Sequence, residues 1–145
     1  MTESVAVLDS DVLSEISRGH PVASARAKEY LRHHGRFTVT AVTLCERLRG
    51  YRAALKAGKP LEEQLRQFAA LAATFVVLPF DTDAADCAAS IWGALGARAR
   101  RAERDILIAA IASVHGLPLV TRNRRDYAPV MALDFVKLKL LDWTA

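Results

Sequence analysis

The amino-acid sequence predicts a three-layer α/β/α domain in which a mostly parallel, five-stranded sheet lies between two layers of helices. Short apolar or β-branched runs alternate with longer segments of helical composition, without a linker or an internal repeat. A chain of 145 residues that is 52% hydrophobic and 25% charged has the size and composition of one globular domain. Strand and helix alternation favours a parallel sheet covered on both faces. We therefore expect a single domain over residues 1–145.

Five short segments have the composition of buried strands. They are mostly apolar or β-branched and are bounded by Gly, Pro or polar residues, as expected for strands of a parallel sheet. The expected strands are residues 5–8, 37–40, 75–80, 117–121 and 135–138.

Helical segments fill the intervals between these strands. We expect helices at residues 21–33, about 42–56, from 60 onward, 82 to about 101 and 103–115, and a short turn or helix at 124–128. Gly35, Gly58 and Gly116 stand at expected helix ends, and Pro60 suits the first position of a helix. Residues 106–112 are apolar nearly all round, which predicts a helix buried between the sheet and another element.

Four acidic or amide residues, far apart in the sequence, fall where this fold brings them to one edge of the sheet. Asp9 and Asn123 come just after predicted strands. Glu46 lies about one turn beyond a strand, and Asp105 is at the start of the buried helix. In open α/β sheets, sites form at the carboxyl ends of the strands.

A cluster of carboxylates at this edge would repel itself unless a cation neutralised it. Hard oxygen ligands select Mg²⁺ or Mn²⁺. We therefore predict a Mg²⁺ site, with Mn²⁺ as a substitute. An ion held there would activate a water and stabilise the charge that develops on a phosphate.

Two of the four residues also suit a structural role at a helix terminus. Glu46 follows Thr43 by three positions, the spacing of a capping box. Asp105 would complement the dipole at the start of its helix. For these two residues the sequence leaves both interpretations open, a structural role at the helix terminus and a role in the site.

Asp9 and Asn123 have structural interpretations as well. A carboxylate that ends a buried strand needs a partner, and Ser10 and backbone amides would supply one for Asp9. Asn123 suits a turn, in which case Asp126 is the alternative fourth residue of the site.

Charge and composition indicate the kind of partner and the compartment. The net charge is +4, the pI is about 9.4, and Arg outnumbers Lys, which suits a polyanion such as RNA. No apolar stretch approaches the roughly 20 residues that span a bilayer, and residues 1–4 lack the start of a signal peptide. We expect a cytoplasmic protein.

Cys45 and Cys87 lack metal-site spacing, so we expect both to be buried and reduced.

Four segments, in this order and spacing, resemble the successive motifs of PIN-domain ribonucleases. They are LDSDVLSE (8–15), TAVTLCE (40–46), DILIAA (105–110) and LVTRNRRDY (119–127), followed by the tail LDW (141–143). The group they most resemble is the VapC toxins of bacterial toxin–antitoxin pairs. The resemblance covers essentially the whole chain.

This resemblance implies a Mg²⁺-dependent endoribonuclease that cleaves tRNA, rRNA or mRNA and is inhibited by a VapB-like antitoxin. It implies the catalytic residues Asp9, Glu46, Asp105 and Asn123, with Asp9 and Asp105 as metal ligands. Supporting or alternative site residues are Ser10, Glu103, Thr121 and Asp126. Candidates for binding the RNA backbone are Arg98, Arg100, Arg101, Arg122 and Arg124. Exposed apolar surface expected between helices favours a homodimer and a groove for an antitoxin helix.

Two positions depart from the family pattern. Asp11 and Arg104 stand where members often have Asn. Arg104 would pair with an acid and partly neutralise the site in the absence of metal. Asp11 creates a resemblance to haloacid-dehalogenase-type phosphatases, with Asp9 as nucleophile and Asp11 as general acid, although no suitable Lys accompanies them. A further alternative is a non-catalytic module that binds RNA or protein on a nuclease fold.

Overall fold

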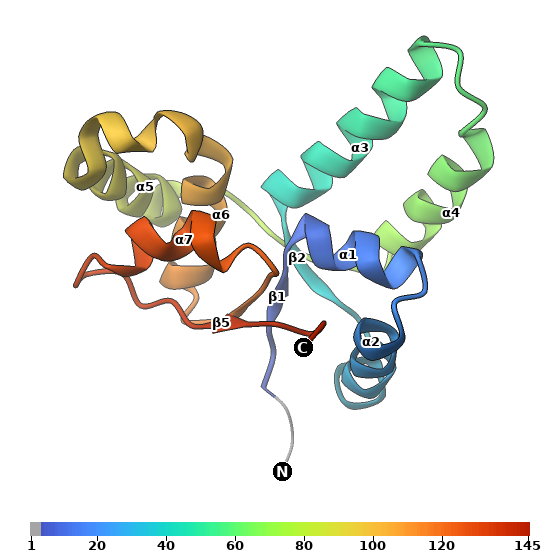
Figure 1. Ribbon diagram of the computed structural model, residues 1–145, viewed down its shortest axis with the longest axis horizontal. Helices are drawn as coiled ribbons and strands as arrows, with labels where there is room; N and C mark the ends of the chain where they lie inside the picture. Colours follow the sequence, from blue (N-terminus) through green and yellow to red (C-terminus); the bar gives the residue numbers. More distant parts are fainter. Residues whose placement is uncertain (1–3) are drawn as a thin grey trace.

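The computed structural model describes residues 4–145, whose strands form one parallel sheet (Figure 1). Its strands are β1 (Val7–Leu8), β2 (Thr38–Thr40), β3 (Val76–Leu78), β4 (Leu119–Val120) and β5 (Leu140–Leu141), in the order β3-β2-β1-β4-β5. The predicted α/β class and five-stranded sheet are confirmed. Residues 1–3, considered above for a signal peptide, lie outside the described residues.

The helices cover both faces of this sheet. They are α1 (Ser10–Ser17), α2 (Pro21–His34), α3 (Ala41–Lys56), α4 (Glu62–Ala72), α5 (Thr82–Leu95), the 3₁₀ helix η1 (Gly96–Arg101), α6 (Glu103–Val114) and α7 (Arg124–Met131). In Figure 1, α5, α6 and α7 lie together on one side, α1 and α2 lie on the other, and α3 and α4 form a hairpin that extends away from the sheet.

Two hydrophobic cores explain the three layers. Successive strand residues point to opposite faces of a sheet. Val7 and Leu119 accordingly join the core formed with α5, α6 and α7. Leu8 and Val120 join the other core, which contains residues of α1, α2 and α4. Burial on both faces is why β1 and β4, in the interior of the sheet, are apolar throughout rather than alternating.

The predicted long helix from residue 82 to about 101 was too long. α5 ends at Leu95, and Gly96 adopts a φ of 56°. Glycine adopts positive φ without the steric cost that a Cβ imposes, so the chain turns there and continues as η1. The arginines expected at the end of a long helix therefore lie on a separate 3₁₀ helix in front of α6.

Three other elements differ more clearly from the prediction, while the remaining bounds shift by a few residues. The fifth strand is Leu140–Leu141 rather than 135–138, because the amides of Leu119 and Thr121 bond the carbonyls of Lys139 and Leu141. α4 begins at Glu62, so Pro60 is not at its first position. Helix α1 was not predicted, although an N-cap acid followed by buried Val12 and Leu13 is its signal.

α6 is buried as predicted, with seven buried residues among its twelve, Asp105, Ile106, Ile108, Ala109, Ala110, Ile111 and Ala112. The expected burial of the cysteines was wrong, because Cys45 is exposed on α3 and Cys87 is only partly buried, although both are free thiols as expected. Within residues 4–145, no helix has both the length and the apolar character needed to cross a bilayer.

Candidate functional site

Asp9 is the most buried acid of the site, with a side chain that is 0% exposed. It follows β1 and is the N-cap residue of α1, where its Oδ1 accepts the amide hydrogen of Ser10 at 2.8 Å. Its Oδ2 accepts hydrogen bonds from the hydroxyls of Thr121 at 3.0 Å and Tyr127 at 2.9 Å. A buried carboxylate is tolerated when its oxygens are satisfied in this way.

Arg104 joins the three predicted acids into one cluster. Its Nη2 lies 2.5 Å from Asp9 Oδ1, and its Nη1 lies 2.6 Å from Asp105 Oδ1. Its Nε donates to Glu46 Oε2. The three acids come from the end of β1, from α3 and from α6, so the structure gathers them at one point as predicted. Arg104 pairs with these acids, as its departure from the family pattern implied.

Glu46 does not cap its helix. α3 begins at Ala41, and its N-cap is Thr40, whose hydroxyl accepts the amide hydrogen of Thr43 at 3.1 Å. The capping-box interpretation of Glu46 was therefore wrong by one turn. With the cap supplied by Thr40, the carboxylate of Glu46 is directed to Arg104 instead.

The electrostatics of the cluster reflect burial and mutual repulsion. Burial raises the pKa of Asp105, the charge of Arg104 opposes this, and the charge of Asp9 adds to it, so the pKa lies above its usual value. Burial alone would lower the pKa of Arg104, but the charge of Asp9 and the contact with Glu46 outweigh it and raise the pKa. The guanidinium is thus a permanent cation among the acids.

Asp11 lies beside this cluster rather than within it. Its Oδ2 accepts the amide hydrogen of Arg122 at 2.9 Å, and its Oδ1 is one of the described buried atoms without a hydrogen-bond partner. Burial, followed by the charge of Asp9, raises the pKa of Asp11. Asp11 thus places a further carboxyl group at the same edge of the sheet.

Asn123 and Asp126 are not joined to the cluster by a described hydrogen bond from their side chains. Asn123 is exposed, occupies the N-cap position of α7 without a side-chain cap, and lines a pocket with Asp11 and Arg122. Its backbone amide donates to Thr121 Oγ1 at 3.0 Å. Asp126 is exposed, but its charge reaches Asp105 and raises the pKa of that acid. Which of the two completes the site stays a prediction.

The other predicted residues surround the acids. Ser10 contributes its backbone amide to Asp9, and Glu103 is exposed and lines a cavity of about 430 Å³ with Glu46 and Arg104. The five predicted RNA-binding arginines, Arg98, Arg100, Arg101, Arg122 and Arg124, are all exposed. Arg122 Nη1 also pairs with Glu15 at 3.0 Å.

Sequence reasoning missed the role of Tyr127. This residue is 0% exposed, and its hydroxyl donates to Asp9. Burial and the charges of Asp9 and Asp105 raise its pKa, so it keeps its proton and remains a donor. The available signal was its helical spacing from buried Val130, which places Tyr127 on the inner face of α7.

The donor set suits a hard divalent cation. Asp9, Asp105 and Glu46 supply carboxylate oxygens, the ligands that Mg²⁺ and Mn²⁺ prefer, and they already converge on a cationic group, the guanidinium of Arg104. Among residues 4–145, no three His, Cys, Asp or Glu side chains stand in a ready metal-binding arrangement. In this structure the guanidinium of Arg104 lies between the three carboxylates.

Fold and site together define a class of protein: a parallel α/β domain that gathers acids from separate elements at the carboxyl edge of its sheet. The family model of the PIN domain matches residues 6–129, and the chain belongs to this family. The PIN fold predicted from the sequence motifs is thus confirmed.

Several solved structures have the same fold. VapBC-1 from nontypeable Haemophilus influenzae has a TM-score of 0.78 at 19% identity, covering 98% of this chain and 100% of that chain. FitAcB from Neisseria gonorrhoeae has a TM-score of 0.75 at 23% identity, covering 96% and 98%. DNA-bound VapBC from Salmonella typhimurium has a TM-score of 0.73 at 23% identity, covering 97% and 99%. No curated protein matches the sequence.

Proposed function

We propose that this PIN-domain protein is a Mg²⁺-dependent endoribonuclease that acts as the toxin of a toxin–antitoxin pair. The observation that carries the proposal is that the carboxylates of Asp9, Glu46 and Asp105 meet at one point, around the guanidinium of Arg104. Membership of the PIN family and the likeness to the VapBC and FitAcB structures support it. The family match favours this function over the phosphatase alternative, which required a Lys that the motifs lack.

The burial of the three acids suggests different roles. The side chains of Asp9 and Asp105 are 0% and 10% exposed, and they would be the direct ligands. Glu46 is 27% exposed and faces the adjoining cavity, so it would orient the attacking water or accept its proton. When bound, Mg²⁺ supplies a polarised water and stabilises negative charge on the scissile phosphate.

The substrate would be held by the arginines around this edge. Arg98, Arg100 and Arg101 lie on η1, directly before the helix that carries Asp105. Arg122 and Arg124 follow β4, and Arg124 is the first residue of α7. Exposed guanidinium groups bind phosphate oxygens without reading sequence, so this arrangement would position an RNA backbone.

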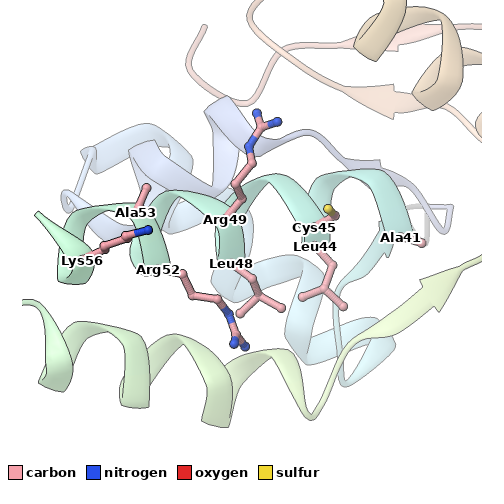
Figure 2. Close-up of a pocket in the computed structure, with 8 residues that line it drawn as sticks. All are labelled: Ala41, Leu44, Cys45, Leu48, Arg49, Arg52, Ala53 and Lys56. Atoms are coloured by element: carbon pink, nitrogen blue, oxygen red, sulfur yellow. The ribbon is translucent and has the colours of Figure 1, made fainter.

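An apolar groove along α3 supports a protein partner. It has a volume of about 710 Å³ and is lined by Ala41, Leu44, Cys45, Leu48, Arg49, Arg52, Ala53 and Lys56. Figure 2 shows Leu44, Leu48 and Arg52 extending from the same side of the helix. An apolar floor with basic residues beside it suits an amphipathic antitoxin segment that carries acidic side chains.

Cleavage of labelled RNA by the purified protein tests the proposed activity. We expect cleavage in Mg²⁺ or Mn²⁺, none with a chelator, and a loss of about a hundredfold or more in the Asp9→Asn variant. Asp134→Asn, the same chemical change at an exposed position, is the matched control and should cleave normally. Circular dichroism would confirm that both variants are folded.

Three results would contradict the proposal. Unchanged cleavage by Asp9→Asn would remove the acids from the reaction. Hydrolysis of small phosphate esters, lost in the same variant, would favour the phosphatase. Binding of RNA without cleavage in any divalent metal would favour a binding module. For the antitoxin, co-expression with the product of an adjacent small reading frame should suppress cleavage.

A further inference from the structure

The guanidinium of Arg104 occupies the point where the three acids meet. Its three nitrogens donate to three different carboxylates: Nη2 to Asp9, Nη1 to Asp105 and Nε to Glu46. Arg104 is itself 31% exposed, whereas Asp9 is fully buried. The guanidinium therefore reaches from the rim of the site down to its most buried acid.

The hydrogen bonds of Asp9 decide which oxygen a metal ion could use. Two hydroxyls, from Thr121 and Tyr127, already bond Oδ2. Oδ1 accepts the amide of Ser10 and the guanidinium of Arg104. A carboxylate oxygen offers about two lone-pair sites, so both oxygens of Asp9 are filled. The amide and the hydroxyls belong to packed parts of the fold, which leaves Arg104 as the donor that can yield its place.

When no metal is bound, electrostatics favour the position of the Arg104 guanidinium among the three acids. Buried carboxylates close together are costly unless a cation compensates them, and arginine does not lose its proton in proteins. The cavity of about 430 Å³ beside it, which Glu46 and Glu103 also line, gives the side chain room to move when another cation arrives. Glu103 places a further carboxylate at the wall of this cavity.

We propose that Arg104 is a built-in competitor of the metal ion, which holds the three acids together in its absence and must leave Asp9 Oδ1 before a divalent cation can bind. This inference rests on the proposed metal site and concerns what sets its affinity. A guanidinium at this point lowers the affinity for a divalent ion, because the ion gains the acids only after displacing a cation already paired with them.

Binding of Mn²⁺ alone, measured by calorimetry or by the loss of its free paramagnetic signal, tests this competition. We expect Arg104→Gln to bind Mn²⁺ about tenfold more tightly than the unaltered protein, or more. In chelator the same variant should melt at a lower temperature, because its acids are uncompensated, and Mn²⁺ should raise its melting temperature further than that of the unaltered protein. Arg32→Gln is the matched control, since it removes one positive charge from an exposed ion pair on α2.

If Arg104→Gln does not fold, the Mn²⁺ affinity of Arg104→Lys can be compared with that of the unaltered protein instead. A lysine ammonium is a single point charge that cannot serve three carboxylates as the guanidinium does, so this variant should bind Mn²⁺ with intermediate affinity. Equal or weaker Mn²⁺ binding by both Arg104 variants, with normal binding by the unaltered protein, would overturn the competition and leave the proposed function standing. Absence of Mn²⁺ binding in every protein would overturn both.

Discussion

Helices α3 and α6 each bring one acid to the same site, but they are packed very differently. Seven of the twelve residues of α6 are buried, whereas among the sixteen residues of α3 the buried one is Thr43. Asp105 is consequently fixed by the core. Glu46 lies on a helix with an open groove along its flank (Figure 2), and its described side-chain contact is with Arg104.

This difference separates two requirements that one site must meet. A direct metal ligand must be held rigidly, which a helix buried on nearly all sides provides. A residue that contacts water or substrate needs access to solvent, and a helix at the surface provides that. The surface helix is also free to bind a partner, so the acid it carries lies where a bound protein would affect the site.

The largest expected contrast is between the two acids themselves. Asp105→Asn should lower the rate of RNA cleavage at saturating Mg²⁺ by about a hundredfold or more, whereas Glu46→Gln should lower it by about tenfold. The reason is that Asp105 would bind the ion directly, while Glu46 would act through a water. Single-turnover rates measured over a range of Mg²⁺ concentrations provide the comparison. Equal losses in the two variants would mean that burial does not distinguish their roles.

A smaller contrast concerns the stability of the two helices. Ile108→Ala removes a fully buried side chain from α6 and should lower the free energy of unfolding by about 2–5 kcal/mol. Leu48→Ala on α3 removes a partly buried side chain and should cost about 1 kcal/mol. Urea denaturation of both variants measures the difference. A larger cost at Leu48 would show that α3 is part of the stable core.

The sequence predicted the fold class and the gathering of the acids for a physical reason. Parallel strands bring their carboxyl ends to one edge, so Asp9 and Asp105 could be placed there without coordinates. The pairing of Arg104 with an acid was also expected, because this residue adds a positive charge where the family often has Asn, beside a cluster of acids. These features follow from element order and charge.

Other features depended on contacts that the sequence does not display. Three of the four residues at 135–138 are apolar, but the register with β4 places the fifth strand at Leu140–Leu141. Glu46 matched a capping box until the structure placed the N-cap at Thr40. The bond from Tyr127 to Asp9 joins residues 118 positions apart and arises from the packing of α7. The part played by Asn123 remains a prediction.

The most direct test of the acidic site is a crystal structure determined with Mn²⁺, in which anomalous scattering locates the ion. We expect a peak about 2.1 Å from carboxylate oxygens of Asp9 and Asp105, with the guanidinium of Arg104 withdrawn from Asp9 Oδ1. A protein saturated with Mn²⁺ that shows no peak at these acids, with Arg104 still bound to all three, would contradict the account.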